Sequence, residues 1–402
     1  MKEMSEPADG LMGLARLMRM TISGADMGSL GMQLIARAGG NPKMADACAL
    51  MDLSTILQLR GDRELGLNIQ RQALALQQIY AVACTSPGKS AIRLLMIMSD
   101  GDLMANSPIE SLLEEKDVTL NIVYITKERD MPAVLPEHDV LFVAIAESEQ
   151  NIPLLKKVSA AIASWPVPVL NDPLRIAALS RDNCALLLKD APGIDMPETV
   201  KVGRETLVRV AGAMKLDGMD FPVIIRPVDS HAGNGLEKID DASGIAVYLS
   251  SVGSDEFYVS RFVDYRQADG LFRKYRIVLI AGCPFICHMA ISSHWMIHYA
   301  NAGMADSAEK RDEEARFMAE FDEDFAVRHA EAFKAIGDRI GLDYLGIDCA
   351  ETADGRLLIF EADSCMIVHA LDPVDVYGYK QKPMRRVFDA FYQMLLDAKQ
   401  GA

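Results

Sequence analysis

The chain has 402 residues, of which half are hydrophobic and 24% are charged. This composition is typical of a packed globular protein and excludes an intrinsically disordered one. The formal net charge of −16 argues against binding to the phosphate backbone of nucleic acids, because such binding needs a basic face. It leaves room for a nucleotide, which needs only a few local cations.

Cysteine usage and hydropathy predict a cytoplasmic protein. Seven cysteines lie scattered through apolar segments without paired spacing, which favours reduced thiols over disulfides or a zinc site. No apolar run approaches the ~20 residues of a membrane-spanning helix, and the acidic N-terminus lacks the pattern of a signal peptide. We therefore expect no membrane partner.

The first 90 residues are predicted to form a helical segment. Residues 1–30 are rich in Met, Gly and Ser and are expected to fray. Apolar residues then recur every three or four positions in Met44–Arg60 and Asp62–Tyr80, which predicts two antiparallel helices joined at Gly61. The stretch LQLRGDRELGLNIQRQAL resembles one unit of a tetratricopeptide repeat. One unit cannot bury both of its faces, so we expect the pair (44–80) to pack on the protein body or on another subunit in a homodimer, with peptide binding as an alternative.

Residues 91–172 alternate between strands and helices, which predicts a small parallel sheet covered by helices. The turn Ser99–Asp102 follows the first strand, at the carboxyl end where open sheets bind ligands. The expected strands are Ile92–Met98, Val118–Ile125, Asp139–Ile145 and Val167–Leu170, and the expected helices are Ser107–Glu115, Ile152–Ser164 and, after this domain, Leu174–Lys189.

A predicted strand, Phe221–Val228, contains a cation, Arg226, and leads into a loop rich in serine and glycine, Ser230–Gly235. Glycines let the backbone approach a ligand closely, and successive N–H groups form a concavity that binds anions. The loop is therefore a candidate for covering phosphates, and an ordinary hairpin turn is the alternative.

The predicted strand Phe272–Ile280 directs two cations to one face, because Lys274 and Arg276 are two residues apart. Three histidines follow, at 288, 294 and 298. His294 and His298 are four residues apart and would share one face of a helix as metal ligands. No acid or third ligand lies at metal spacing, so contact with substrate or plain packing is favoured.

An acidic hairpin is predicted near the end of the chain. Two apolar strands, Tyr344–Ala350 and Leu357–Ala362, flank the Asp354-Gly355 pair that favours a two-residue turn. The acids of this hairpin are Asp348, Glu361 and Asp363, and oxygen ligands of this kind suit Mg²⁺. The alternative is a hairpin with solvated acids. Amphipathic helices are predicted before and after it, at Asp324–Ile340 and Arg385–Ala398.

The order of these parts resembles the ATP-grasp superfamily of carboxylate–amine ligases, over roughly residues 91–400. FPVIIRPVDSHAGNG resembles the strand and phosphate-covering loop of that family, KYRIVLI its arginine-bearing strand, and GIDCAETADGRLLIFEAD its metal hairpin. The resemblance implies an α/β (α+β) fold. A small Rossmann-like domain at 91–172 would precede a two-lobed ATP-grasp domain at 173–402, with a lid at about 195–263 and a metal-bearing part at about 264–395.

The resemblance also implies a set of site residues. ATP would lie between the two lobes, with adenine against Phe257–Val263 and with Mg²⁺, or Mn²⁺, held by Asp348, Glu361 and Asp363. Arg276 would neutralise charge on the transferred phosphoryl group, and His231 or His294 would take the amine proton. The residues implied for the nucleotide are Arg226, Ser230, His231, Gly233, Gly235, Arg261, Val263, Asp264 and Lys274.

The function implied is the ATP-dependent joining of a small-molecule or peptide carboxylate to an amine through an acylphosphate, with release of ADP and phosphate. A kinase on the same frame and a nucleotide-binding scaffold without catalysis are the alternatives. The sequence departs from the family at three positions: Arg226 stands where a Lys is usual, Lys274 where an acid is frequent, and Asp363 where an Asn is usual.

Overall fold

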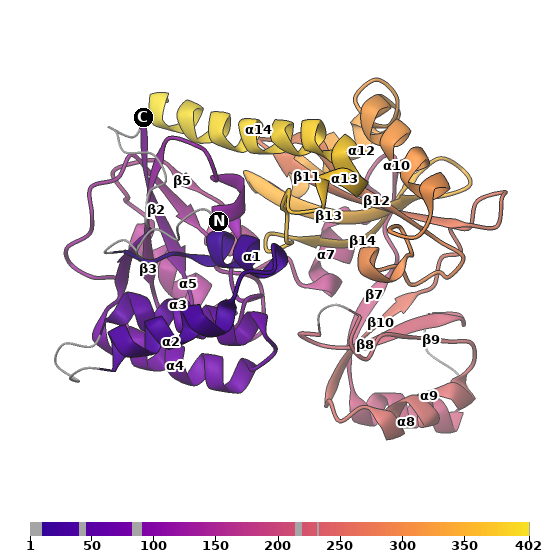
Figure 1. Cartoon of the computed structure of the whole chain (residues 1–402). Helices are drawn as coiled ribbons and strands as arrows, with labels where there is room; N and C mark the ends of the chain where they lie inside the picture. The colour runs from indigo at the N-terminus through magenta and orange to yellow at the C-terminus, as the bar shows by residue number, and fades with distance from the viewer. Residues whose placement is uncertain (1–9, 40–45, 83–90, 214–218, 231–232, 402) are drawn as a thin grey trace. The chain divides into compact units, whose positions relative to one another are not determined.

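The computed structural model describes residues 10–39, 46–82, 91–213, 219–230 and 233–401. The chain forms two compact units (Figure 1). Unit 1 comprises Met1–Ala177, Leu342–Tyr344 and Ser364–Ala402, and unit 2 comprises Ala178–Gly341 and Leu345–Asp363. Within the described residues, no helix is long and apolar enough to cross a membrane, and the cysteines are all free thiols.

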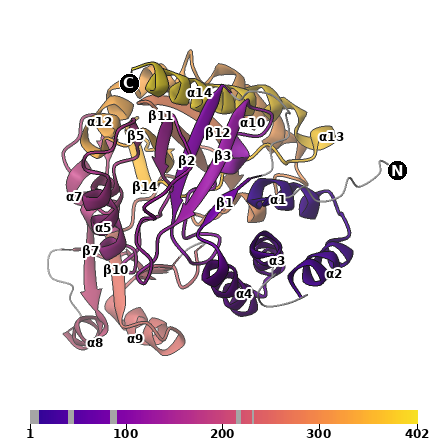
Figure 2. The same cartoon turned by 90° about the vertical axis from the view of Figure 1, so that its left-hand side faces the viewer.

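The centre of unit 1 is a five-stranded sheet of order β1-β3-β2-β4-β5. The three pairings among β3, β2, β4 and β5 are parallel and confirm the predicted parallel sheet, and β1 adds an antiparallel edge beside β3 (Figure 2). The long C-terminal helix α14 (Gln381–Gln400) packs on β2 and β4, where Phe391 meets the rings of Phe142 and Tyr344. The strands are β1 (Ile79–Ala81), β2 (Ile92–Met98), β3 (Val118–Tyr124), β4 (Val140–Val143) and β5 (Val169–Leu170), and helix α5 spans Ile152–Ile162.

The helix predicted at 107–115 is wrong, because the chain forms only a 3₁₀ turn, η1 (Ile109–Leu112). The residues just before this turn are held in an extended conformation. The Asn106 side chain accepts a hydrogen bond from the Ser99 N–H at 2.8 Å and donates one to the Ser99 carbonyl at 2.9 Å. The Ser107 N–H donates to the Ala144 carbonyl. These contacts and Pro108 leave too few residues for a regular helix before β3.

The expectation that residues 1–30 fray is wrong for the described part of that segment, which forms two helices, α1 (Leu14–Ile22) and α2 (Met27–Ala38). They pack on the predicted helical pair, now α3 (Ala47–Leu59) and α4 (Arg63–Leu76). The apolar side chains that join these helices are Met12, Leu17, Met27, Leu30, Leu34, Ala49, Leu53 and Ile56. The chain itself therefore covers one face of the pair, and a homodimer through this segment stays a prediction.

The helical pair also contacts the turn at the carboxyl end of β2. The Gln70 side chain on α4 donates to the Gly101 carbonyl and accepts from the Gly101 N–H, both at 2.9 Å. Arg63 forms an ion pair with Asp102 at 2.7 Å. The pair thus packs on the body of unit 1, as one of the sequence alternatives predicts.

Two carboxyls, the buried Asp52 and the partly buried Glu110, anchor the start of α1 and make unit 1 sensitive to pH. Asp52 accepts hydrogen bonds from the N–H groups of Met12 and Gly13 at 2.9 and 3.1 Å, and Glu110 accepts one from Ala15 at 3.3 Å. Burial raises the pKa of each carboxyl to about 7. In the unfolded chain their pKa values lie near 4. The folded state therefore holds more protons between about pH 4 and 7, so this contribution to stability falls as the pH rises through that window.

We expect the wild-type free energy of unfolding, measured relative to Asp52→Asn, to fall by about 1 kcal/mol per pH unit between about pH 5 and 7. Urea denaturation at a series of pH values measures this difference. Asp338→Asn is the matched control, since Asp338 is 63% exposed and pairs with Lys334 on the surface. A difference that grows with rising pH would contradict the assignment.

Unit 2 contains two sheets. The smaller one, which we call the lid sheet, is antiparallel, with the order β7-β10-β8-β9. Helices α8 (Arg204–Ala213) and α9 (Ala242–Ser251) lie together over one of its faces (Figure 1). The strands are β7 (Thr199–Gly203), β8 (Val223–Pro227), β9 (Glu237–Ile239) and β10 (Glu256–Arg261). Val223, Ile225, Phe257 and Val259 belong to the core under the helices. Because side chains alternate along a strand, Arg226 and Tyr258 point from the opposite face.

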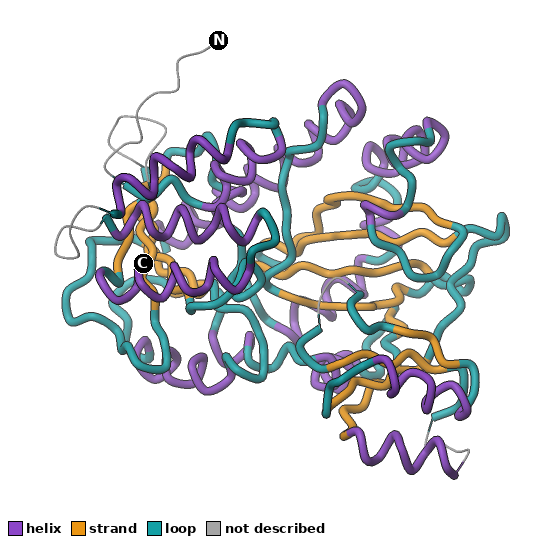
Figure 3. Tube along the Cα trace, turned by 60° about the horizontal axis from the view of Figure 1, so that its bottom comes forward, coloured by secondary structure: helices purple, strands orange, loops and turns teal. Residues whose placement is uncertain are grey.

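The larger sheet of unit 2 has the order β12-β11-β13-β14-β6 and is antiparallel except for the β14–β6 pair. Figure 3 shows its strands running side by side. The predicted strand 272–280 is confirmed as β11, and the predicted hairpin as β13 and β14. The strands are β6 (Ile194–Asp195), β11 (Phe272–Ile280), β12 (Cys283–Ser292), β13 (Tyr344–Glu351) and β14 (Leu357–Asp363), and the helices are α10 (Ala308–Glu320), α11 (Phe325–Arg328) and α12 (Ala330–Ile340).

Two further details differ from the sequence prediction. The helix predicted at 174–189 is broken into α6 (Pro173–Ile176) and α7 (Arg181–Leu188), and the boundary between the units falls between them. The hairpin turn is longer than two residues, because the Thr352 N–H donates to the Arg356 carbonyl and Gly355 lies inside the loop with φ +80°. The break after α6 frees Arg181 to begin a separate helix beside β14.

Candidate active site

The acidic hairpin places its three carboxylates on one face of the larger sheet. Asp348 on β13 is opposite Glu361 on β14, and Gly346 is opposite Asp363. Residues two apart on a strand share a face, so Asp363 lies on the same side as Glu361. The register shifts after Asp348, which marks a β-bulge, and bulges often lie next to functional sites. The register therefore puts the three acids on one face of the hairpin, and their role as metal ligands stays a prediction.

Two cations from β11 hold Asp348. Nζ of Lys274 lies 2.7 Å from Oδ2 of Asp348, while Nε of Arg276 donates to Oδ1 at 2.8 Å and Nη2 to Oδ2 at 3.0 Å. Asp348 is only 1% exposed. Burial alone would raise the pKa of Asp348, but Arg276 and Lys274 hold it well below its usual value. Asp348 is thus a buried carboxylate with a cation on each oxygen.

Two arginines from different elements act on Glu361, Arg181 by a hydrogen bond and Arg226 by its charge. Arg181, at the start of α7, donates to Oε1 of Glu361 and to the Phe360 carbonyl. Burial opposes ionisation of Glu361, yet the charges of Arg181 and Arg226 hold its pKa below the usual value. Burial and the nearby charge of Arg181 lower the pKa of Arg226 to about 10. The charge of Arg226, from the lid sheet, therefore acts on Glu361 in the larger sheet, and Arg226 remains charged at neutral pH.

Arg226 also fixes the turn that starts the glycine-rich loop. Its Nε donates to Oγ of Ser230 at 3.1 Å and its Nη2 donates to the Ser230 carbonyl. The Ser230 hydroxyl in turn donates to the Pro227 carbonyl at 2.8 Å. Two donors of this guanidinium thus hold the loop in place. The structure therefore shows Arg226 and Ser230 as a pair that shapes the predicted phosphate loop.

The glycines of this loop are required by its geometry. Gly233 and Gly235 have φ of +73° and +66°, a region that side-chain-bearing residues rarely adopt. A Cβ at Gly233 would collide with Nε2 of His298, and one at Gly235 would lie 2.9 Å from Cδ of Pro227. Burial and then the charge of Lys274 lower the pKa of His298. His298 therefore connects the loop to the cations of β11, although no sequence pattern favours His298 over the neighbouring histidines.

Several predicted site residues lie apart from this cluster. His294 is exposed, and its Nδ1 accepts a hydrogen bond from the Met296 N–H at 3.2 Å. His294 and His298 do not share a helix, because they flank a loop before the 3₁₀ turn η2 (Tyr299–Asn301). Asp264, next to Val263 after β10, is exposed and accepts from the Arg266 N–H. His231 lies outside the described residues.

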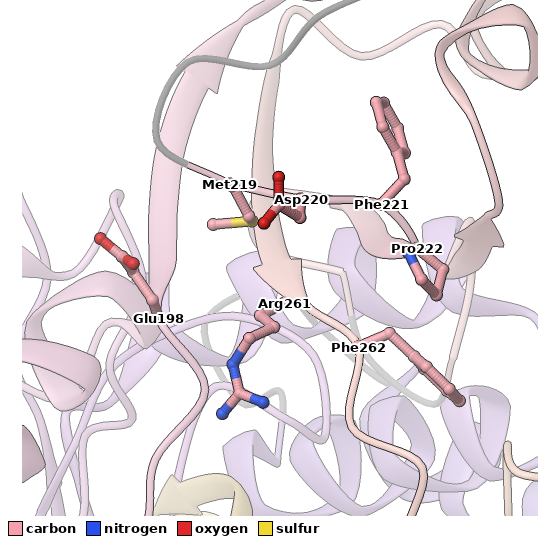
Figure 4. A pocket seen from close by; sticks show the side chains of 7 residues that line it. All are labelled: Glu198, Met219, Asp220, Phe221, Pro222, Arg261 and Phe262. Carbon is pink, nitrogen blue, oxygen red and sulfur yellow. The ribbon is translucent and has the colours of Figure 1, made fainter.

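Arg261 lies on the helix-covered face of the lid sheet, opposite to Arg226, because it pairs with Val223 in the register. It forms an ion pair with Asp195 at 2.7 Å. Arg261 and Phe262 line a cavity of about 310 Å³ at the end of β10, whose side chains are shown in Figure 4. The other lining residues are Glu198, Met219, Asp220, Phe221 and Pro222. The segment predicted to contact adenine, Phe257–Val263, ends at this cavity.

The donor set does not fit a magnesium ion as it stands. Mg²⁺ takes six oxygen ligands in near-ideal octahedral geometry. Both oxygens of Asp348 are engaged by Lys274 and Arg276, and Oε1 of Glu361 by Arg181. Among the described residues, no group of three or more His, Cys, Asp or Glu side chains is arranged to hold a metal ion. The magnesium site at Asp348, Glu361 and Asp363 therefore stays a prediction.

Comparisons with known proteins were made by sequence and by structure. No protein-family model matches the chain, and no curated protein matches it. The chain is similar to the VanG D-Ala:D-Ser ligase from Enterococcus faecalis, with 13% identity and a TM-score of 0.47 over 76% of this chain and 99% of that one. It is similar to D-alanyl-alanine synthetase A from Vibrio cholerae, with 13% identity and a TM-score of 0.47 over 78% and 100%.

A RimK domain ATP-grasp protein from Sphaerobacter thermophilus is similar as well, with 16% identity and a TM-score of 0.41 over 75% of this chain and 99% of that one. These likenesses concern the chain trace alone. The lid sheet, the loop after β8 and the larger sheet with its acidic hairpin follow one another in the predicted order. This topology confirms the fold class predicted from the sequence, an α/β (α+β) chain.

Proposed function

We propose that the chain is an ATP-dependent ligase that joins a carboxylate to an amine through an acylphosphate and releases ADP and phosphate. The observation that most supports this is the convergence of cations where the two sheets of unit 2 meet, beside the glycine loop. The four cations are Arg181 on α7, Arg226 on β8, and Lys274 and Arg276 on β11. A triphosphate is a multiply charged anion, and phosphoryl transfer is catalysed mainly by positioning and charge neutralisation.

The chemistry follows in two steps. A substrate carboxylate oxygen attacks the γ-phosphorus, the bond from that phosphorus to the bridging oxygen breaks, and ADP leaves with the electron pair. Arg276, which is held in place by Asp348, neutralises negative charge on the phosphoryl group during its transfer. An amine nitrogen then attacks the acyl carbon, the carbon–oxygen bond to phosphate breaks, and phosphate leaves. The amine proton passes to a base, and an amide remains.

His298 is the described histidine that is best placed to accept that proton. It lies against Gly233, and its pKa is lowered from 6.5 by burial and then by Lys274. A lowered pKa leaves the imidazole neutral at pH 7, which is the form that accepts a proton. His294, which was predicted from the sequence as a candidate base, lies on an exposed loop instead.

We expect His298→Ala to lower kcat/KM for ATP consumption by at least about tenfold, because a positioned general base contributes ~100-fold or more. The acid limb of the wild-type pH–rate profile, below pH 6.5, should disappear in this variant. His294→Ala is the matched control and should stay within about twofold. An equal loss in both variants would rule out the specific role of His298.

The experiment that tests the ligase is a phosphate-release screen of carboxylate and amine pairs, including peptides, with ATP. Mass spectrometry of the products then separates the outcomes. ADP, phosphate and an amide support the ligase, whereas ADP and a stable phosphorylated product identify the kinase alternative. Absence of both ATP binding and turnover with every pair would overturn the proposal.

A scaffold that binds a nucleotide without turnover is a second candidate. One observation favours it: two donors of Arg226 are committed to Ser230 rather than directed at a ligand. Its signature would be saturable ATP binding with no ADP formed under any condition of the screen.

A further inference from the structure

Asp348 is already paired with two cations of the chain, Lys274 and Arg276. Lys274 is 20% exposed at its side chain, Arg276 24% and Asp348 only 2%. The Lys274 ammonium also donates to the Ile297 carbonyl at 3.4 Å. A carboxylate has about four lone-pair positions, and three hydrogen bonds or ion contacts from two cations occupy most of them here.

The charges around the hairpin support the same conclusion. Four cations of the chain, Arg181, Arg226, Lys274 and Arg276, act on Asp348 and Glu361 of the hairpin. These cations outnumber the two carboxylates before any ligand arrives. Without Lys274 and Arg276, the same carboxylates would repel a phosphate chain. An ammonium held by a buried acid is a preorganised cation, which costs no reorganisation when an anion binds.

We propose that Lys274 acts as a built-in counter-ion on this face, so that the chain binds the triphosphate of a nucleotide without a divalent cation. The inference rests on the proposed function, because it concerns the nucleotide of that same site. Lys274 holds the position on Asp348 where a metal ion would need a free carboxylate oxygen. Arg226 and the glycine loop complete the anion site from the lid sheet.

The experiment measures the dissociation constant of ATP by calorimetry, once in excess EDTA and once in excess MgCl₂. We expect the two values to agree within about threefold. Binding only in the presence of magnesium would overturn this inference and leave the proposed function standing. Absence of binding in both conditions would overturn the proposed function and, with it, the inference.

Three variants assign the effect to Lys274. Lys274→Ala should weaken binding in EDTA by about tenfold, since one partly buried charge contact is lost. Lys274→Arg keeps the charge and should bind as the wild type does. Lys334→Ala, on the exposed surface of α12, is the control and should have no effect. Wild-type affinity of Lys274→Ala in EDTA would contradict the role given to Lys274.

Lys274→Asp is the sharpest variant, because it replaces the cation with an acid beside Asp348. Its binding in EDTA should vanish, and magnesium should restore it, since a second free carboxylate creates oxygen ligands for the ion. The thermal unfolding midpoint of each variant, measured without nucleotide, separates lost binding from lost folding. If Lys274→Asp folds and binds ATP equally with and without magnesium, the counter-ion role is refuted.

Discussion

Asp348→Asn is expected to lower the free energy of unfolding by about 3 kcal/mol, because removing one partner of a buried ion pair leaves the other uncompensated. Here the amide would leave both Lys274 and Arg276 without their carboxylate. The pKa of Asp348 is held down in the folded state, so the stabilisation is present above the unfolded pKa. It is lost only as the pH falls toward the folded value. Urea denaturation at pH 7 measures the change.

The matched control for this substitution is Asp324→Asn. Asp324 forms an ion pair with Arg328 at 2.9 Å, but its side chain is 60% exposed. Exposed pairs contribute about 0–1 kcal/mol, so the control should change stability by less than about 1 kcal/mol. If the two variants unfold at the same urea concentration, the buried pair is not what stabilises this sheet.

Gly233→Ala is expected to weaken ATP binding by about tenfold or more. Alanine at positive φ costs ~1–2 kcal/mol, and the new methyl group would also collide with the ring of His298. The loop must then move away from His298, and its N–H groups would no longer line up toward a phosphate chain. Calorimetric titration with ATP measures the loss.

Gly270→Ala separates strain from collision. Gly270 has φ +83°, but nothing lies within 4 Å of a Cβ added there, so this variant carries the backbone strain alone. It should lower stability slightly and leave ATP affinity unchanged. The double variant Gly233→Ala with His298→Ala removes the collision. Its loss of affinity should be smaller than the sum of the two single losses, and a purely additive result would contradict the contact.

The sequence predicted best where local rules decide. Strand β11 has the predicted bounds, since its apolar run is bracketed by turn residues. The three acids share a face because alternation in the hairpin requires it. The first helices were missed because the glycines at 28 and 31 and the many methionines of this stretch hide its apolar period. Only packing on α3 reveals why they form.

The partners of the acids could not be predicted for a different reason. Arg181 meets Glu361 although 180 residues separate them, and no pattern in the sequence links a helix start to a strand so far away. His298 reaches Gly233 from a loop that has no periodicity. Non-local contacts of this kind decide which side chain of several similar ones belongs to the site.

The acidic hairpin leaves unit 1 after Tyr344 and returns to it at Ser364. Both ends are fastened there: Asn171 donates to the Tyr344 carbonyl and accepts from the Tyr344 N–H, and the Ser107 hydroxyl donates to the Ser364 carbonyl. The continuous stretch 178–341 therefore lacks all three carboxylates. A cut before residue 178 would keep the hairpin in the C-terminal fragment but would remove Asn171 and Ser107, so any transplant of this site into another protein would have to carry these anchoring residues with it.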